Sequence, residues 1–492
     1  MGRPVLGVVS LLSIVRRSPR RVFEIPASIE AAGLTAAHIL AATAVTLHVL
    51  LRRREVGSSV GWIGVAWLSP FFGPALYLMF GINRVRRRAS RMRTPRAPRR
   101  PGTHAARGLR DDHLAPLQRA GDRITRRVVE HGNTVQLLQN GDEAYPAMIA
   151  AIDRARASVA LASYIFRADA AGRDFIDALA RAVKRGVEVR VLVDGYGSGY
   201  LLSFAYWRLR WRGVHAARFM HSLLPWRMPM LNLRNHKKML IVDGAVAFTG
   251  GLNIGAENRL RDNPTHPVRD THFRVEGPVV RQLMDVFTAD WQFAAHEPLE
   301  DDPWFPELTE AGNVATRVIV SGPDQDLEKI EFVILEALSC ARASIKIMTP
   351  YFLPDERLIT ALALAAMRGV EVDVIVPTLG NHPLVDWAMR AQIGPLLVAG
   401  CRVWRSPPPF DHTKLMTVDG IWGLVGSSNW DVRSFRLNFE LDMEVYHDDL
   451  VRQIEGLMAS MHGAPITLTE LNSRSLPARL LHSAARLMFP YL

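Results

Sequence analysis

The chain has 492 residues, of which 48% are hydrophobic and 22% charged, and its formal net charge is +12. This length suggests roughly three domain-sized units, and two cysteines exclude a disulfide-stapled scaffold. Nineteen arginines and three glutamates give residues 1–110 a charge of +16, so the other 382 residues carry −4. The basic face of a nucleic-acid-binding domain is therefore not expected, and arginines beside apolar stretches favour a membrane surface.

Two uncharged apolar stretches near the N-terminus predict a transmembrane hairpin. Ala31–Leu51 has 21 residues and Val60–Ile82 has 23, and each would exceed a hydrocarbon core of about 30 Å as a helix. Pro70 and Pro74 interrupt the second stretch, so a re-entrant segment is the alternative. The arginine-rich tails lie on the same side of the hairpin, and the positive-inside rule then predicts a multi-pass anchor over residues 1–92 in the cell (inner) membrane, with the catalytic part in the cytoplasm.

Residues 93–118 are rich in arginine, proline and glycine and predict a basic linker. The chain then contains one strand–helix–strand pattern twice, about 185 residues apart, and each helix ends at an Arg-Gly pair. The first copy has a strand over Val159–Tyr164 and a helix ending at Lys184, and the second has a strand over Ile345–Tyr351 and a helix ending at Met367. The duplication predicts two similar α/β halves, over residues 119–300 and 301–492.

The segment Pro477–Met488 ends the predicted second half. Its apolar residues share one helical face that is flanked by Arg479 and Arg486. This pattern indicates a helix at the interface of an anionic bilayer, and a helix packed on the domain is equally open.

Each half also carries the same set of polar residues at the same spacing. Relative to the histidine, lysine stands at +2, aspartate at +7, glycine at +14 and asparagine at +17. The copies are His236, Lys238, Asp243, Gly250 and Asn253 in the first half, and His412, Lys414, Asp419, Gly426 and Asn429 in the second. We expect a strand from the histidine to the aspartate, an Asp-Gly turn and a return strand, so that histidine, lysine and asparagine lie together.

This constellation suits phosphoryl transfer. One neutral imidazole can attack phosphorus, and a second, protonated imidazole can donate to the leaving alkoxide. Two lysines and two asparagines can bind the non-bridging oxygens, and we assign Asn253 and Asn429 to phosphate binding. Only six residues of the chain are lysines, and Lys238 and Lys414 are two of them. Because arginine is the usual cation of this chain, lysine at both places indicates a local requirement.

Two downstream carboxylates are expected to orient the imidazoles: Asp270 after the first pattern and Glu440 after the second. Asp243 and Asp419 belong to the repeated catalytic pattern, but we favour a structural part for them, either in the turn or in a salt bridge near the site.

The duplicated His-x-Lys-x4-Asp pattern resembles that of the phospholipase D superfamily. The stretches Ser58–Gly81, Asn235–Gly244 and Asp431–Glu440 further resemble bacterial cardiolipin synthases of that superfamily, and the likeness covers residues 30–492. It implies two pseudo-twofold-related α/β/α halves with mixed sheets behind a membrane hairpin. It also implies a phosphatidyl-histidine intermediate and no required metal or other cofactor. By the family's pattern we assign His236 as the nucleophile and His412 as the acid/base, and the pseudo-symmetry leaves the exchange of these roles open.

The same resemblance implies that two phosphatidylglycerol molecules are joined into cardiolipin with release of glycerol, so an anionic phospholipid and the lipid bilayer are the expected partners. Phospholipase D hydrolysis or exchange with another alcohol, such as serine, is the alternative. An inactive membrane scaffold is the alternative from a different class. A nuclease is disfavoured by the anchor and by the −4 balance of the catalytic part, so no nucleic acid is expected.

Overall fold

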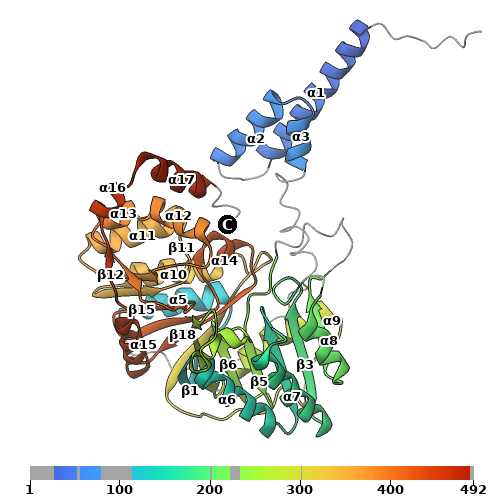
Figure 1. Ribbon diagram of the computed structural model, residues 1–492, viewed down its shortest axis with the longest axis vertical. Coiled ribbons are helices and arrows are strands. Elements are labelled where there is room, and N and C mark those ends of the chain that lie inside the picture. The colour runs from blue at the N-terminus through green and yellow to red at the C-terminus, as the bar shows by residue number, and fades with distance from the viewer. Residues whose placement is uncertain are drawn as a thin grey trace, which may run out of the picture. The chain divides into compact units, whose positions relative to one another are not determined.

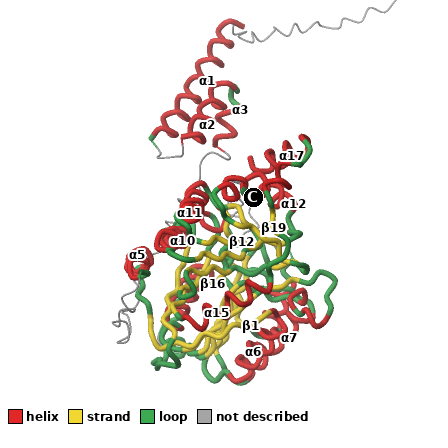
Figure 2. The backbone as a smooth tube through the Cα atoms, turned by 90° about the vertical axis from the view of Figure 1, so that its left-hand side faces the viewer, coloured by secondary structure: helices red, strands yellow, loops and turns green. Residues whose placement is uncertain are grey.

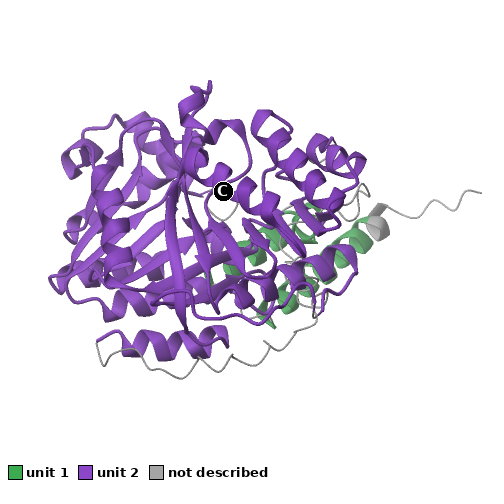
Figure 3. Cartoon of the chain, turned by 90° about the horizontal axis from the view of Figure 1, so that it is seen from below, with its two compact units in different colours: residues 1–83 green, residues 84–492 purple. Residues whose placement is uncertain are grey.

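The structure is a computed structural model that describes residues 27–51, 56–78, 113–199, 202–221, 233–300 and 302–487. The chain divides into two compact units, residues 1–83 and 84–492 (Figure 3). Most of the predicted linker lies outside the described residues.

The first unit contains the helices α1 (Ala27–Leu50), α2 (Val56–Leu68) and α3 (Phe72–Leu76). Helix α1 is long and apolar enough to cross a membrane over Ala31–Leu50. It packs on the other two helices through a small cluster that includes Val45, Ala66 and Tyr77. The unit is therefore held together by its own apolar contacts.

The stretch predicted as a second span over 60–82 is not one continuous helix. Helix α2 has 13 residues, about 20 Å of helix, which is short of the bilayer core. Pro70 lacks the backbone N–H that would continue the helix, and Phe71 has a φ of 57° that turns the chain back. Helix α3 then lies so close to α2 that a Cβ on Gly73 would be 2.1 Å from the Val65 carbonyl oxygen.

The second unit is built on one mixed sheet of 15 strands, with helices on both faces (Figures 1 and 2). The first half supplies, in sheet order, β1 (Glu130–Gln139), β8 (Thr271–Glu276), β6 (Val246–Gly250), β5 (Met239–Val242), β2 (Ser158–Ser163), β3 (Glu188–Asp194) and β4 (His215–Phe219). The second half supplies β9 (Val314–Ser321), β18 (Glu440–Tyr446), β16 (Trp422–Gly426), β15 (Leu415–Val418), β10 (Ser344–Met348), β12 (Glu371–Pro377), β13 (Arg402–Ser406) and β19 (Pro465–Ile466).

Apart from β19, the two strand orders are the same when read outward from the middle, where β1 pairs antiparallel with β9. This pairing is the centre of the predicted pseudo-twofold arrangement, and it fuses the halves into one sheet. The predicted strand–helix–strand units are present in both halves as β2–α7–β3 and β10–α11–β12, where α7 is Ala170–Lys184 and α11 is Glu356–Met367.

Three apolar clusters fill the layers between helices and sheet. The outer cluster of the first half lies under α6 (Asn140–Arg154), α7 and α8 (Phe204–Trp211), and that of the second half lies under α10 (Lys329–Cys340), α11, α12 (Pro383–Gln392) and α13 (Gly394–Val398). The third cluster joins α9 (Val280–Ala295) of the first half to α15 (Asp448–Ser460) of the second through residues such as Leu283, Phe287 and Ile454. Because this cluster is shared, the halves form one compact unit rather than two.

The C-terminal boundary predicted for the linker, residue 118, lies too far along the chain. Helix α5 (Ala115–Thr125) already begins inside residues 93–118, and Leu114 and Leu117 are buried in the cluster of the second half. Asp122 of α5 forms an ion pair with the buried Arg317 of β9. The segment assigned to the start of the first half therefore packs on the second.

At the C-terminal end, α16 (Leu468–Asn472) precedes α17 (Leu476–Leu487), which covers nearly all of the predicted interfacial helix. His482 and Ala485 of α17 are buried, and the His482 ring stacks on Trp387 of α12. Leu480, Leu481 and Leu487 are exposed. The helix is thus packed on the domain by one face and presents leucines to its surroundings by another.

Candidate active site

Short backbone pairings between the halves position the two histidines. The strand β14 (Phe410–Asp411) pairs in parallel with β7 (Val268–Arg269), and Asn235 forms the equivalent bridge with Phe439. The amide of His236 then donates to the Phe439 carbonyl at 2.9 Å, and the amide of His412 donates to the Arg269 carbonyl at 2.7 Å. Each histidine is therefore placed beside the residue that follows in the other half, which is Glu440 or Asp270.

The histidine–carboxylate pairs cross between the halves. Nδ1 of His236 lies 2.9 Å from a Glu440 oxygen, and Nδ1 of His412 lies 2.8 Å from an Asp270 oxygen. Burial lowers the pKa of His236 well below its usual value, as do Lys238 and Lys414, and it lowers the pKa of His412 to about 3. Both imidazoles are thus neutral, and each leaves Nε2 for chemistry.

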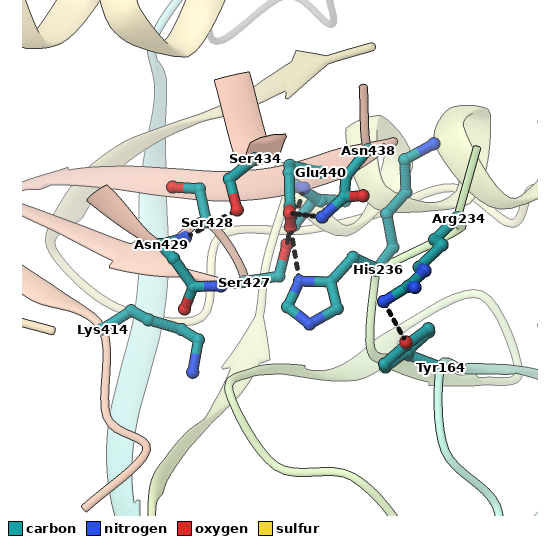
Figure 4. Close-up of polar contacts among 12 residues, drawn as sticks. Tyr164, Arg234, His236, Lys414, Ser427, Ser428, Asn429, Ser434, Asn438 and Glu440 are labelled. Carbon is teal, nitrogen blue, oxygen red and sulfur yellow. Dashed lines mark hydrogen bonds and ion pairs between the residues drawn. The ribbon is translucent and has the colours of Figure 1, made fainter. Parts of the chain in front are cut away.

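Glu440 is held by two further side chains that the sequence analysis missed. The Ser427 hydroxyl donates to it at 2.6 Å, and the Asn438 amide donates at 3.0 Å (Figure 4). Asp270 instead accepts from the amide of Thr271 at 2.8 Å. The first half has Gly251 in the place of Ser427, and a Cβ there would be 2.1 Å from the Asp270 carboxylate. The glycine therefore leaves the space that this carboxylate occupies.

Both predicted lysines lie in the site. Lys238 and Lys414 are 2% and 4% exposed, and each ammonium group lies at the backbone carbonyl of the histidine two residues before it. Burial lowers the pKa of Lys238 to about 7 and that of Lys414 to about 8. Two poorly solvated cations beside neutral imidazoles favour the binding of an anion.

Both predicted asparagines are buried as well. The side-chain oxygen of Asn253 accepts from the Ile165 amide at 3.1 Å, which leaves its NH2 group as the donor. Asn429 lies beside Lys414, next to His236 (Figure 4). Its backbone amide donates to the Ser434 hydroxyl at 3.2 Å, so the turn that carries it is fixed. These positions suit the phosphate-binding role expected for the two amides.

Asp243 and Asp419 do not reach the histidines. The histidines precede β5 and β15, whereas the two aspartates follow them. Each aspartate is therefore seven residues, or about 20 Å of extended chain, beyond its histidine. Asp243 accepts hydrogen bonds from three consecutive amides at the start of β2, and Asp419 does the same before β10. Both residues have a positive φ in the expected Asp-Gly turn. Among the residues that the structure describes, neither aspartate forms the expected salt bridge near the site. Asp243 and Asp419 instead hold the turns in place through backbone amides.

Two tyrosines also flank the site, one in each half. The Tyr164 ring meets the His236 imidazole edge-on at 4.9 Å between centroids, and the Tyr351 ring meets His412 at 6.3 Å. The sequence analysis placed both tyrosines at the ends of the repeated first strands but did not assign either to the site. The signal available for Tyr164 was its position at the end of the repeated first strand, which matches that of Tyr351.

The chain is similar to known proteins in sequence and in fold. Residues 148–291 and 334–462 match the sequence model described as "Cardiolipin synthase, PLD-like domain", and residues 40–81 match "Phospholipase_D-nuclease N-terminal". The fold is similar to that of a phosphatidylserine synthase from Haemophilus influenzae, with a TM-score of 0.59 and 14% identity over 76% of this chain and all of that one.

Curated relatives align along most of the chain. The major cardiolipin synthase ClsA of Bacillus subtilis is 34% identical over 464 residues, which cover 90% of this chain and 95% of that protein. A cardiolipin synthase of Geobacillus thermodenitrificans is 32% identical over 455 residues, which cover 90% of this chain and 91% of that protein. With two matched halves and a crossed pair of histidines between them, the chain belongs to the phospholipase D-like cardiolipin synthase family.

Proposed function

We propose that this protein is a membrane-bound phosphatidyltransferase that makes cardiolipin from two phosphatidylglycerol molecules and releases glycerol. The observation that carries the proposal is the crossed pair of imidazoles, each held at Nδ1 by a carboxylate of the other half. Two imidazoles meet the needs of a two-step transfer, because one attacks phosphorus while the other first donates and then accepts a proton.

In the first step, Nε2 of His236 attacks the phosphorus of one phosphatidylglycerol. The P–N bond forms, the P–O bond to the head-group glycerol breaks, and His412 gives a proton to the departing oxygen. In the second step, His412 takes a proton from a hydroxyl of the second phosphatidylglycerol. That oxygen attacks the phosphorus, the P–N bond breaks and cardiolipin leaves.

The charges of the site serve this cycle. Lys238 and Lys414 hold the non-bridging oxygens with Asn253 and Asn429, where negative charge gathers in the transition state. The lowered pKa of His412 makes its imidazole neutral, but the phosphodiester of a substrate brings a negative charge that offsets the lysines and favours the imidazolium. Substrate binding itself thus prepares the acid.

The membrane role rests on two apolar features. Helix α1 is long enough to span a bilayer, and α2 and α3 fit a re-entrant segment that is broken at Pro70. Exposed leucines and arginines of α17 suit contact with anionic lipid. We place the protein in the cell (inner) membrane with the second unit in the cytoplasm. With a single span, residues 52–54 and 84–100 lie on the side of that unit, and their twelve arginines outnumber the five of residues 1–26 on the other side.

The test is incubation of the purified full-length protein with phosphatidylglycerol vesicles, followed by mass spectrometry of the lipid and water-soluble products. We expect cardiolipin plus glycerol from the wild type and no cardiolipin from His236→Ala or His412→Ala. Phosphatidic acid alone would assign a hydrolase instead, and no lipid turnover by folded wild type would contradict the proposal.

A further inference from the structure

One group of side chains beside the catalytic pair has no part in the two steps above. The Arg234 guanidinium donates to the Tyr164 hydroxyl at 3.1 Å and lies 4.3 Å above the ring centre of Tyr196. Tyr164 in turn contacts the His236 ring. In Figure 4, Arg234 and Tyr164 lie on one side of the imidazole, and Lys414 and Asn429 lie on the other.

Two arginines approach each other on this side of the site, and the buried carboxylates of Asp194 and Asp431 lie near them. Within the part of the chain that the structure describes, no carboxylate forms an ion pair with Arg234, and its buried Nε has no hydrogen-bond partner. Arg433 of the second half lies close enough to be repelled: burial lowers its pKa, and the charge of Arg234 lowers it further. Two guanidinium groups brought together out of water favour an anion between or beside them.

The second half has no cation in the place of Arg234. Phe410 occupies the position in the second half that Arg234 holds in the first, two residues before the histidine, and its ring lies 6.1 Å from His412. Tyr351, the counterpart of Tyr164, donates to the neutral Asn381 amide at 2.6 Å. The transferred phosphate meets matched residues from both halves. Arg234 has no equivalent in the other half. It is therefore suited to bind a substrate group other than the transferred phosphate.

We propose that Arg234, together with Arg433 and Tyr164, binds the phosphodiester of the second phosphatidylglycerol, the one that accepts the phosphatidyl group. This rests on the proposed function. Cardiolipin joins its two phosphates through a single three-carbon bridge, so the acceptor's own phosphate lies beside the transferred one when its hydroxyl attacks. The planar guanidinium of Arg234, oriented by Tyr164 and Tyr196, can bind two oxygens of that phosphate.

This subsite distinguishes the lipid acceptor from smaller alcohols. Glycerol and water both reach the phosphatidyl-histidine, but neither carries a phosphate. Holding the acceptor's phosphate places its hydroxyl at the reacting phosphorus and raises its effective concentration over water. Removing the subsite is therefore expected to spare the first step and to weaken the second step for phosphatidylglycerol only.

The test compares two reactions of the full-length protein on the same phosphatidylglycerol vesicles. One is cardiolipin formation, and the other is exchange of the head group with isotope-labelled glycerol, which uses the same first step and an acceptor without phosphate. For Arg234→Gln we expect cardiolipin formation to fall at least tenfold, with glycerol exchange within about twofold of wild type. Arg234→Lys keeps the charge without the planar fork and should recover part of the cardiolipin rate.

Arg181→Gln is the matched control, because Arg181 pairs with Asp153 on the exposed surface of the same half and should change neither reaction. Equal loss of both reactions in Arg234→Gln, or loss of neither, would overturn the subsite. A wild type that exchanges glycerol but makes no cardiolipin would overturn the proposed function and the subsite with it. The retained exchange reaction also shows that the variant is folded.

Discussion

The two halves of the second unit have the same strands in the same order, but they differ in how each prepares its part of the site. In the first half Gly251 leaves room for Asp270, whereas in the second half Ser427 and Asn438 donate to Glu440. The pKa of Asp270 is lowered, because Lys414 and His412 outweigh its burial, while burial raises the pKa of Glu440. Symmetry of the backbone therefore does not impose symmetry of the charges.

The largest expected effect tests whether both histidines are needed. His236→Ala and His412→Ala should each reduce cardiolipin formation by about 10³-fold or more, because each removes a partner of both steps. The two variants should differ in one respect. His412→Ala keeps the proposed nucleophile and should accumulate phosphatidyl-enzyme, detectable by intact-protein mass spectrometry, whereas His236→Ala should not. The reverse pattern would exchange their roles.

The next largest effect concerns the crossed carboxylates. Asp270→Asn and Glu440→Gln should each lower kcat by about 10²-fold or more, because the imidazole loses the acceptor that fixes its tautomer. Each substitution lies in the half opposite to the histidine that it disturbs. Double variants test this pairing. If Glu440→Gln lowers kcat further in the His412→Ala background but not in the His236→Ala background, Glu440 acts through His236. Retention of wild-type kcat in either single variant would contradict the orienting role.

The pH profile should separate the two lysines. With a pKa of about 7 for Lys238 and about 8 for Lys414, both ammonium groups are charged at low pH and lose charge as the pH rises. We expect kcat/KM for phosphatidylglycerol to fall about tenfold or more from pH 7 to pH 9. Lys238→Arg should move the start of this fall upward, since arginine does not titrate there. A flat profile to pH 9 in the wild type would argue against the lysines as the titrating groups.

The smallest effect on turnover is expected at the two turn aspartates. Asp243→Ala and Asp419→Ala should each cost about 1–3 kcal/mol of stability, because three backbone amides lose their acceptor. The loss should be larger for Asp419, which also lies 2.6 Å from Nε2 of His113. The kcat of the folded variants should stay within about threefold of wild type. Thermal unfolding measures the first effect, and a kcat loss near that of the histidine variants would return these residues to the active site.

Local patterns in the sequence predicted much of this fold. The strand before Asp243, the turn at Asp243 and Gly244, and the return strand are all present, because Asp-Gly pairs adopt positive φ readily. The paired histidines, lysines and asparagines were found because two copies at one spacing reinforce each other. These features depend on neighbours within about twenty residues, which a sequence pattern records.

What the sequence did not show depends on contacts between distant segments. That Glu440 serves His236 follows only from the bridge between Asn235 and Phe439. Pro70 and Pro74 left a continuous span and a re-entrant segment both open, and the φ of Phe71 is what shows that the chain turns back there. Leu114, which lies in the predicted linker, is buried in the apolar cluster of the second half. Each of these features depends on a residue far away in the chain or on the backbone conformation of a turn, and a local sequence pattern records neither.

The fusion of both halves into one sheet has a consequence for how such a site is able to change. In a dimer of identical chains, an arginine two residues before one histidine must appear two residues before the other as well. Here β1 and β9 join two copies that are encoded separately, so Arg234 and Phe410 are free to differ. A single chain can thus keep two equivalent histidines for the reaction while the residues beside each histidine come to bind different parts of the substrates.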